Sequence, residues 1–218
     1  MVTLSEENYL KAIYHLSNHG SISVSTNAIA EKMETKASSV TDMIKKLAEK
    51  DFVNYIKYQG ASLTEQGRLT AVSVIRRHRL WEMFLVSKLN FSWDEVHNVA
   101  EQLEHIRSEK LINELDAFLE FPTHDPHGDP IPDKDGNIQS LDKIALSQVK
   151  ENSSCVCVGV IDSSTEFLKF LDKNQIALGS EIKVISKEPF DESMNIELKG
   201  KRITISKLIS NNLYVKTN

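Results

Sequence analysis

The sequence lacks any apolar run long enough to cross a membrane. Its longest runs are far shorter than the ~18 residues that a membrane-spanning helix requires, and the first residues, MVTLSEENYL, lack the pattern of a signal peptide. We therefore expect a cytoplasmic protein with no membrane partner.

Cysteine is scarce, and its two copies lie close together. Cys155 and Cys157 alternate in SCVCVGV, which places both on one face of a probable strand. This geometry is poor for a mutual disulfide. We interpret both as small core or surface residues.

An excess of positive charge is also absent. Lysine and arginine total 26 and aspartate and glutamate total 31, which gives a net charge of −5. This balance predicts no general affinity for polyanions, so any contact with nucleic acid must come from a local patch. The length of 218 residues exceeds that of a typical single domain, and more than one domain is expected.

The first third of the chain has the pattern of a helix-turn-helix followed by a hairpin. Apolar spacing predicts helices over residues 4–16, about 26–33 and about 38–50, the last capped by Ser38. Two short strands joined by a turn at Gly60 follow. This order indicates a winged helix-turn-helix with a recognition helix, although the third helix alone could equally present an ordinary solvated face.

Hydroxyl and lysine side chains on the third helix and the hairpin are the candidate contacts to DNA bases and phosphates. They are Ser38, Ser39, Thr41, Lys45, Lys46 and Lys57.

Imidazole and carboxylate groups are concentrated between residues 78 and 105. His97 falls on one face of a predicted helix together with Glu101, Glu104 and His105, whereas the apolar residues of that helix point mostly elsewhere. His78 and Glu82 form a second pair one turn apart. Such ligands suit manganese or ferrous iron, and the lack of thiolate disfavours a closed structural zinc site. The alternative is a solvated helix face rich in ordinary Glu and His.

Four of the five prolines lie in the segment FPTHDPHGDPIP, which marks a boundary. We interpret its histidines, His124 and His127, as loop residues rather than metal ligands. From about residue 141 onward, short β-type segments interrupted by one helix at TEFLKFLDKN predict a small β-barrel.

Motifs along nearly the whole chain resemble the metal-dependent repressors of the diphtheria toxin repressor and manganese transport regulator family. These motifs are EENYLKAIYHL, IAEKMETKASSVTDMIKKLAEKDFV with LTEQGR, HRLWEMFL, VHNVAEQLEHIRSEKL and DPHGDPIP. The resemblance implies an α+β protein with three domains. They are a winged helix-turn-helix domain (1–70), a helical metal-binding and dimerisation domain (71–140) and an SH3-like β-barrel (141–218).

The same resemblance implies a homodimer that binds manganese or iron, then binds double-stranded operator DNA and represses metal-uptake genes, with no small organic substrate. It assigns the primary metal positions to Asn8, Glu101, Glu104 and His105, and the ancillary positions to His78, Glu82 and His97. Glutamate at position 101 favours the manganese branch, so Mn²⁺ is the expected cofactor and Fe²⁺ the alternative.

Two positions depart from the family pattern. Asn8 stands where aspartate is common, and an amide oxygen brings no charge to a cation. Lys11 stands where a glutamate can supply another ligand, and a protonated lysine cannot bind a divalent ion. The affinity of the site and the number of metals that it holds are therefore left open.

Two other functions agree with parts of the sequence. One is a winged-helix regulator whose metal site is vestigial or structural. The other is a metal-dependent hydrolase, which is disfavoured because the sequence has no HExxH motif and no obvious nucleophile. We therefore expect no enzymatic activity.

Overall fold

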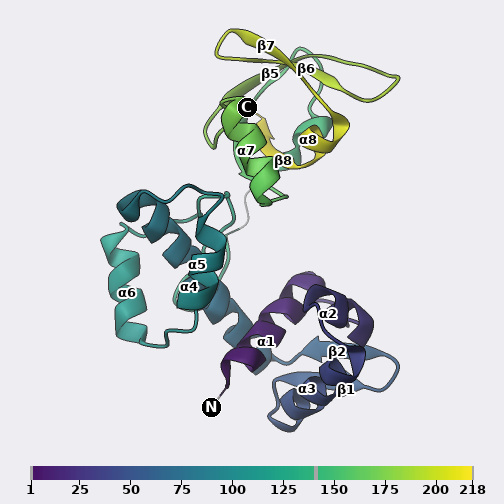
Figure 1. The fold of residues 1–218 in the computed structure, drawn as a ribbon, viewed down its shortest axis with the longest axis vertical. Helices are drawn as coiled ribbons and strands as arrows, with labels where there is room; N and C mark the ends of the chain where they lie inside the picture. Colours follow the sequence, from purple (N-terminus) through teal and green to yellow (C-terminus); the bar gives the residue numbers. More distant parts are fainter. Residues whose placement is uncertain (1, 140–141, 218) are drawn as a thin grey trace. The chain divides into compact units, whose positions relative to one another are not determined.

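The computed structural model describes residues 2–139 and 142–217, which divide into two compact units, each with its own apolar core (Figure 1). The first unit comprises residues 1–78, 101–114 and 132–138, and the second comprises residues 79–100, 115–131 and 139–218.

The first unit begins with three helices and a hairpin in the predicted order. They are α1 (Leu4–Leu16), α2 (Thr26–Lys32), α3 (Ala37–Glu49), β1 (Val53–Ile56) and β2 (Gly60–Leu63). Apolar side chains at helical spacing, including Leu10, Ile29 and Ile44, are fully buried between the helices. The predicted Ser38 cap is wrong, because α3 begins at Ala37 with Lys36 as its N-cap and Ser38 lies within the first turn.

The hairpin closes onto the connection between α1 and α2. β1 and β2 are antiparallel, and the backbone groups of Ala61 and Val24 exchange two hydrogen bonds of 2.8 Å. Gly60 has φ +100°, and a Cβ atom there would lie 2.3 Å from the carbonyl oxygen of Val24. Only glycine allows this close approach. At the tip of the same hairpin, Tyr58 is exposed.

Three further helices follow the hairpin. They are α4 (Glu65–Leu89), α5 (Val96–Leu103) and α6 (Glu109–Phe118). The helix predicted to carry all the donors from His97 onward ends at Leu103, so Glu104 and His105 lie in the turn after α5. No helix among the described residues is long and apolar enough to span a membrane.

The C-terminal segment of the second unit is mainly β structure. It contains β3 (Ile144–Ala145), η1 (Leu146–Gln148), β4 (Ser154–Val160), α7 (Thr165–Lys173), β5 (Glu181–Lys187), β6 (Met194–Leu198), β7 (Lys201–Ile205), α8 (Lys207–Asn211) and β8 (Leu213–Thr217). The strand order is β3-β8-β4-β5-β6-β7, and strand pairing within residues 142–217 leaves the sheet open between β7 and β3. Cys155 and Cys157 are free, buried core residues of β4, as predicted.

The proline-rich loop packs against β4 within the second unit. The carbonyl oxygen of His127 accepts a hydrogen bond of 2.9 Å from the Val160 N–H. Gly128 has φ +85°, and a Cβ atom there would lie 2.1 Å from the carbonyl oxygen of Val158. This contact requires glycine and fixes the backbone on which His127 is carried.

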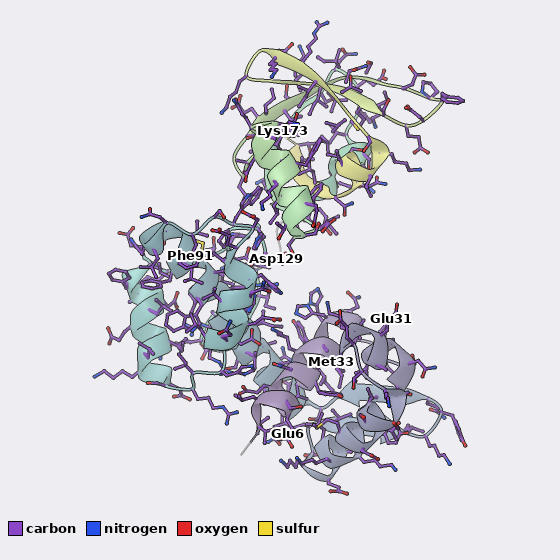
Figure 2. All side chains as sticks on the ribbon, in the orientation of Figure 1. Glu6, Glu31, Met33, Phe91, Asp129 and Lys173 are labelled. Carbon is purple, nitrogen blue, oxygen red and sulfur yellow. The ribbon has the colours of Figure 1, made fainter. Side chains whose placement is uncertain are left out.

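A buried carboxylate ties α1 to α3 in the first unit (Figure 2). Glu6 is fully buried, and it accepts hydrogen bonds of 2.8 and 3.0 Å from Lys50 Nζ and lies 3.1 Å from Lys46 Nζ. Its carboxylate also accepts the Thr3 N–H in a capping box. Burial alone would raise the pKa of Glu6, but the Lys50, Thr3 and Lys46 contacts outweigh it and hold the pKa at about 2.

Glu6→Gln is expected to lower the free energy of unfolding at neutral pH by up to about 3 kcal/mol. The pKa in the folded state, about 2, is below its ordinary value of 4.5. The stabilisation is therefore fully present above pH 4.5 and is lost as the pH falls toward 2. Urea unfolding at pH 7 and pH 3 measures this, with the exposed Glu49→Gln as control. Equal acid sensitivity of Glu6→Gln and the unmodified chain would contradict the assignment.

Candidate metal centre

A lysine lies among the predicted primary ligands. Lys11 Nζ donates hydrogen bonds of 2.7 and 2.8 Å to the two carboxylate oxygens of Glu104, and it lies 3.6 Å from Glu101 Oε1. Glu104 is buried and Glu101 is exposed. An ammonium group therefore already neutralises the carboxylate that the family resemblance assigns to a metal.

His105, another predicted ligand, is held by Glu7 of α1. Its Nδ1 lies 2.7 Å from Glu7 Oε2, while Arg77 Nη2 and Arg107 Nε each lie 3.1 Å from Glu7 Oε1. Arg77 also donates to the backbone carbonyl of Glu104. Sequence patterns did not identify Glu7, because its partners come from distant segments of the chain.

Two further features concern whether a cation could bind at Glu104 and Asn8. Burial alone would raise the pKa of Glu104, but its hydrogen bond with His78 and the charge of Lys11 outweigh burial and lower that pKa, so the carboxylate is ionised. Asn8 Oδ1 is buried and, within the described chain, has no hydrogen-bond donor. That oxygen is the one feature here that favours a cation ligand.

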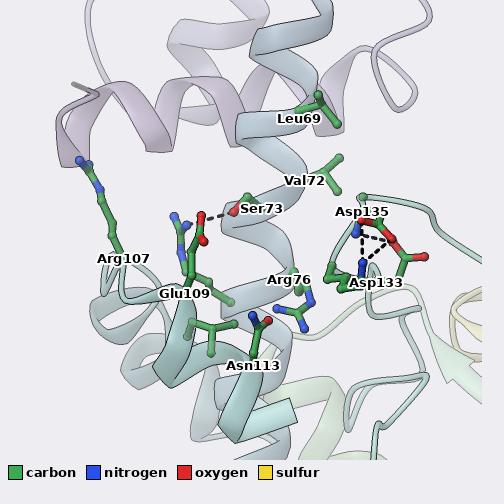
Figure 3. A pocket seen from close by; sticks show the side chains of 13 residues that line it. Leu69, Val72, Ser73, Arg76, Arg107, Glu109, Asn113, Asp133 and Asp135 are labelled. Atoms are coloured by element: carbon green, nitrogen blue, oxygen red, sulfur yellow. Dashed lines mark hydrogen bonds and ion pairs between the residues drawn. The ribbon is translucent and has the colours of Figure 1, made fainter. Parts of the chain in front are cut away.

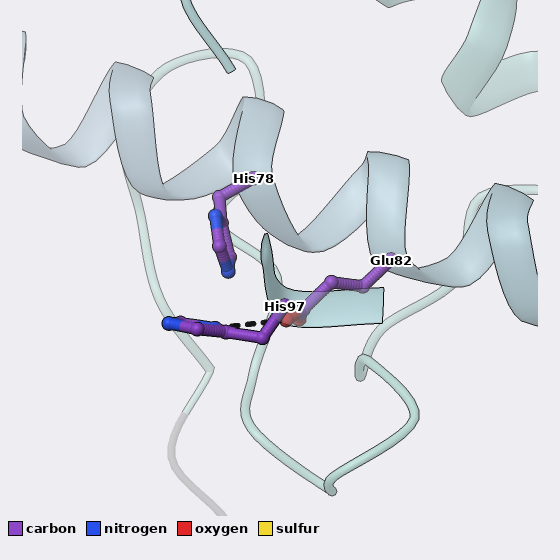
Figure 4. A group of neighbouring side chains, drawn as sticks. All are labelled: His78, Glu82 and His97. Atoms are coloured by element: carbon purple, nitrogen blue, oxygen red, sulfur yellow. Dashed lines mark ion pairs between the residues drawn. The ribbon is translucent and has the colours of Figure 1, made fainter. Parts of the chain in front are cut away.

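The predicted ancillary ligands lie around Glu82 (Figure 4). His78 and Glu82 are one turn apart on α4, and His97 Nδ1 on α5 lies 3.5 Å from Glu82 Oε1. One ligand atom of each residue lies within 4.8 Å of the others. His78 Nδ1 is 2.6 Å from Glu104 Oε2. This contact with a carboxylate orients the ring of His78.

Glu82 also belongs to a second group, which the sequence analysis missed. Glu82, Asp125 and His127 are all buried in the second unit, and one ligand atom of each lies within 4.8 Å of the others. His127 Nδ1 is 3.7 Å from Glu82 Oε2. The alternation of Asp125 and His127 in the proline-rich loop was the available signal, but their meeting with Glu82 depends on the fold.

The ring of His127 is oriented by Trp93. Its Nε2 lies 2.8 Å from the Trp93 carbonyl oxygen, and the two rings are stacked with centroids 6.3 Å apart. Trp93 is itself held by a 3.0 Å hydrogen bond from Nε1 to Asp172. A carbonyl oxygen can only accept, so Nε2 carries a proton, and Nδ1, on the side of Glu82, is the ring nitrogen that could bind a cation after it gives up its own proton.

Asp125 of this second group is held by backbone N–H groups and by a guanidinium. Asp125 accepts the N–H groups of His127 and Asp129, and its side chain lies 3.4 Å from Arg79 Nε. Burial, and then the charges of Glu82 and Asp129, raise the pKa of Asp125 to about 6. A divalent cation beside Glu82 and Asp125 would stabilise the ionised form of both carboxylates.

The carboxylates of Glu82 and Asp125 also affect the pKa of His127. Burial alone would lower it, but the hydrogen bond and charge of Glu82 and the charge of Asp125 raise it to about 8. Two carboxylates and an imidazole form a donor set that suits manganese or ferrous iron, so these residues fit a divalent cation.

The predicted DNA contacts lie on α3 and the hairpin of the first unit. Ser38, Ser39, Lys45 and Lys57 are exposed. The hydroxyl of Thr41 donates a 2.9 Å hydrogen bond to the Ala37 carbonyl oxygen, and Lys46 pairs with Glu6. Lys36, the N-cap residue of α3, makes no side-chain hydrogen bond to the N–H groups of the first turn.

A cavity of about 470 Å³ lies in the first unit between α4, α6 and the loop around Asp133 (Figure 3). Its charged side chains are mixed in sign. They are Arg76, Arg77, Arg107 and Lys134 against Glu109, Asp133 and Asp135. This balance selects neither cations nor anions, and the cavity is separate from both donor groups around Glu82.

Sequence families match three successive segments of the chain. Residues 1–61 match the N-terminal DNA-binding domain of iron-dependent repressors, and residues 64–133 match their metal-binding and dimerisation domain. Residues 144–217 match the FeoA domain.

Individual proteins give the same picture. The chain is 34% identical over 126 residues to the iron-dependent repressor IdeR of Mycobacterium tuberculosis, and this alignment covers 58% of the chain and 54% of that protein. The chain thus spans about half the length of these mycobacterial relatives. It is 24% identical over 200 residues to the diphtheria toxin repressor of Corynebacterium efficiens, covering 84% of the chain and 83% of that protein.

Solved structures match over nearly the full length. A manganese-dependent transcriptional repressor in complex with manganese is 32% identical, with a TM-score of 0.86, over 98% of this chain and 100% of that one. The manganese regulator SloR is 33% identical, with a TM-score of 0.75, over 98% of both chains.

Loss of either carboxylate from the second donor group is expected to weaken Mn²⁺ binding at least tenfold. Glu82→Gln and Asp125→Asn each remove one negative charge and one strong oxygen ligand. Calorimetric titration of the full chain with Mn²⁺ measures the affinity, with Asp129→Asn as the matched control from the same loop. Unchanged affinity in Asp125→Asn would exclude this group as a manganese site.

Proposed function

The chain belongs to the family of iron-dependent repressors that includes the diphtheria toxin repressor, and we propose that it is a metal-activated transcriptional repressor that binds operator DNA. The observation that supports this proposal most strongly is the match to a manganese-dependent repressor over 98% of the chain. The family resemblance and the three-part α+β fold class inferred from the motifs are confirmed. The family consists of DNA-binding repressors, in agreement with the prediction of no enzymatic activity.

The DNA-binding surface that we propose is the N-terminal half of α3 together with the hairpin. The hydroxyls of Ser38 and Ser39 are exposed beside the N–H groups that begin the helix, where the helix dipole favours phosphate. Lys45 and Lys57 add exposed positive charge. These groups form a local patch, as the net charge of −5 requires.

For the metal, Glu82 is the residue that we place at the centre. His127 lies near one of its oxygens and His97 near the other, and Asp125 and His78 each have a ligand atom within 4.8 Å of Glu82. A bound Mn²⁺ or Fe²⁺ would supply two positive charges to this carboxylate-rich set. These oxygen and nitrogen donors, without thiolate, suit Mn²⁺ or Fe²⁺; Glu101, through the family resemblance, favours Mn²⁺, with Fe²⁺ as the alternative. The primary set of Asn8, Glu101, Glu104 and His105 stays a prediction of the family resemblance.

We further propose that the repressor acts as a homodimer in the cytoplasm and controls metal-uptake genes. The match of residues 64–133 to a metal-binding and dimerisation domain supports the dimer. Two recognition helices would then meet successive major grooves, about 34 Å apart or a multiple of that spacing. Linkage requires that operator DNA tighten metal binding by the same factor as metal tightens DNA binding.

The second candidate is a winged-helix regulator whose metal site is structural. The contacts of Lys11 with Glu104 and Glu101 favour it, because they hold α1 to the turn after α5 without a metal. This candidate predicts that a chelator leaves operator affinity unchanged.

Selection of binding sites from a random duplex pool separates the two candidates. The purified full chain is used with Mn²⁺, with anaerobic Fe²⁺ and with chelator, and Glu82→Ala is run in parallel because it removes the carboxylate that both donor groups share. A palindromic site is expected with metal and not with chelator or with Glu82→Ala. Recovery of the same site, with equal affinity, in chelator would contradict metal activation and support the second candidate.

A further inference from the structure

We propose that Lys11 is a built-in cation that takes the place of a metal ion between α1 and the turn after α5. This inference deepens the proposed function and rests on it: metal control would come from the groups around Glu82 alone. The tie between α1 and residues 101–107 would then be present with and without metal.

The ammonium group of Lys11 uses the positions that a cation would need. It lies 2.7 and 2.8 Å from the two oxygens of Glu104 and 3.6 Å from Glu101 Oε1. A divalent ion bound to the same oxygens would face this ammonium at short range in a partly buried place, where like charges repel strongly. The residues present therefore do not fit a divalent ion while Lys11 is charged.

Burial makes the Lys11–Glu104 contact more than a surface ion pair. The side chain of Glu104 is 1% exposed and that of Lys11 is 16% exposed. Glu104 also receives the Nδ1 of His78 at 2.6 Å. A buried carboxylate with two such partners is fully compensated.

Charge balances across this interface without a metal. Its three carboxylates are Glu7, Glu101 and Glu104, and its three permanent cations are Lys11, Arg77 and Arg107. Three negative charges thus meet three positive charges at this place. The buried Asn8 oxygen adds no charge, and one amide oxygen is not a site by itself.

The division of the chain agrees with a tie that does not need metal. Residues 1–78 and 101–114 belong to the same compact unit. In this unit, Glu104 also orients the ring of His78 through the 2.6 Å contact with its Nδ1.

The test uses the full chain in a Glu82→Gln background, which disables both donor groups around Glu82. With Lys11 intact, and with Lys11→Arg, which keeps the cation, no tight Mn²⁺ binding is expected. Lys11→Glu replaces the cation by a carboxylate beside Glu104 and Glu101, and it is expected to gain about one Mn²⁺ per chain. Calorimetric titration and the electron paramagnetic resonance signal of free Mn²⁺ give the stoichiometry.

Thermal unfolding provides a second readout. In chelator, Lys11→Glu is expected to have a lower Tm than the chain with Lys11 intact, because the new carboxylate repels Glu104 and Glu101. Mn²⁺ is expected to restore the Tm, because a bound cation relieves this repulsion. Lys11→Gln removes the charge without adding a carboxylate, and Mn²⁺ is expected to raise its Tm more than that of Lys11→Arg. An equal response of these two variants would overturn the proposal.

Two outcomes of the titration are equally decisive. Stoichiometric Mn²⁺ binding by Glu82→Gln with Lys11 intact would overturn the inference, as would no gain by a folded Lys11→Glu variant. If the unmodified chain binds no Mn²⁺, the proposed function fails, whereas a gain in Lys11→Glu would still support the role of Lys11.

Discussion

The rest of this structure depends on one constraint, which is that the negative charge of each buried carboxylate must be balanced by a cation or by hydrogen-bond donors. Removing an ionised carboxylate from water is costly unless a cation or several hydrogen-bond donors replace the water. Glu6 is compensated by Lys50 and Lys46, and Glu104 is compensated by Lys11 and His78. Around Glu82, buried carboxylates and imidazoles lie within 4.8 Å of one another, and it is there that we propose a metal site.

The residues of that proposed site come from two segments of the chain. α4 supplies Glu82, and the proline-rich loop supplies Asp125 and His127. The loop is fixed on β4 by the glycine at position 128, and the His127 ring is fixed by the carbonyl and indole of Trp93. Preorganised donors lose little conformational entropy when they bind a cation, so this rigid surround favours a tight and selective site.

Local patterns in the sequence predicted what depends on neighbours in the chain. The spacing of apolar residues predicted α1 closely, and the pair His78 and Glu82 follows from one turn of helix. The sequence analysis missed Asp125 and His127 as partners of Glu82, because that contact depends on packing of a loop. It identified Lys11 as an unusual residue, but only the tertiary contact with Glu104 shows what neutralises it.

The most direct test is the location of manganese in crystals of the full chain grown with Mn²⁺, by anomalous scattering measured at the manganese absorption edge. We expect an anomalous peak bounded by Glu82, Asp125 and His127, and no peak beside Glu104, where the Lys11 ammonium remains. A peak coordinated by Glu104 and His105, with Lys11 displaced, would contradict this expectation.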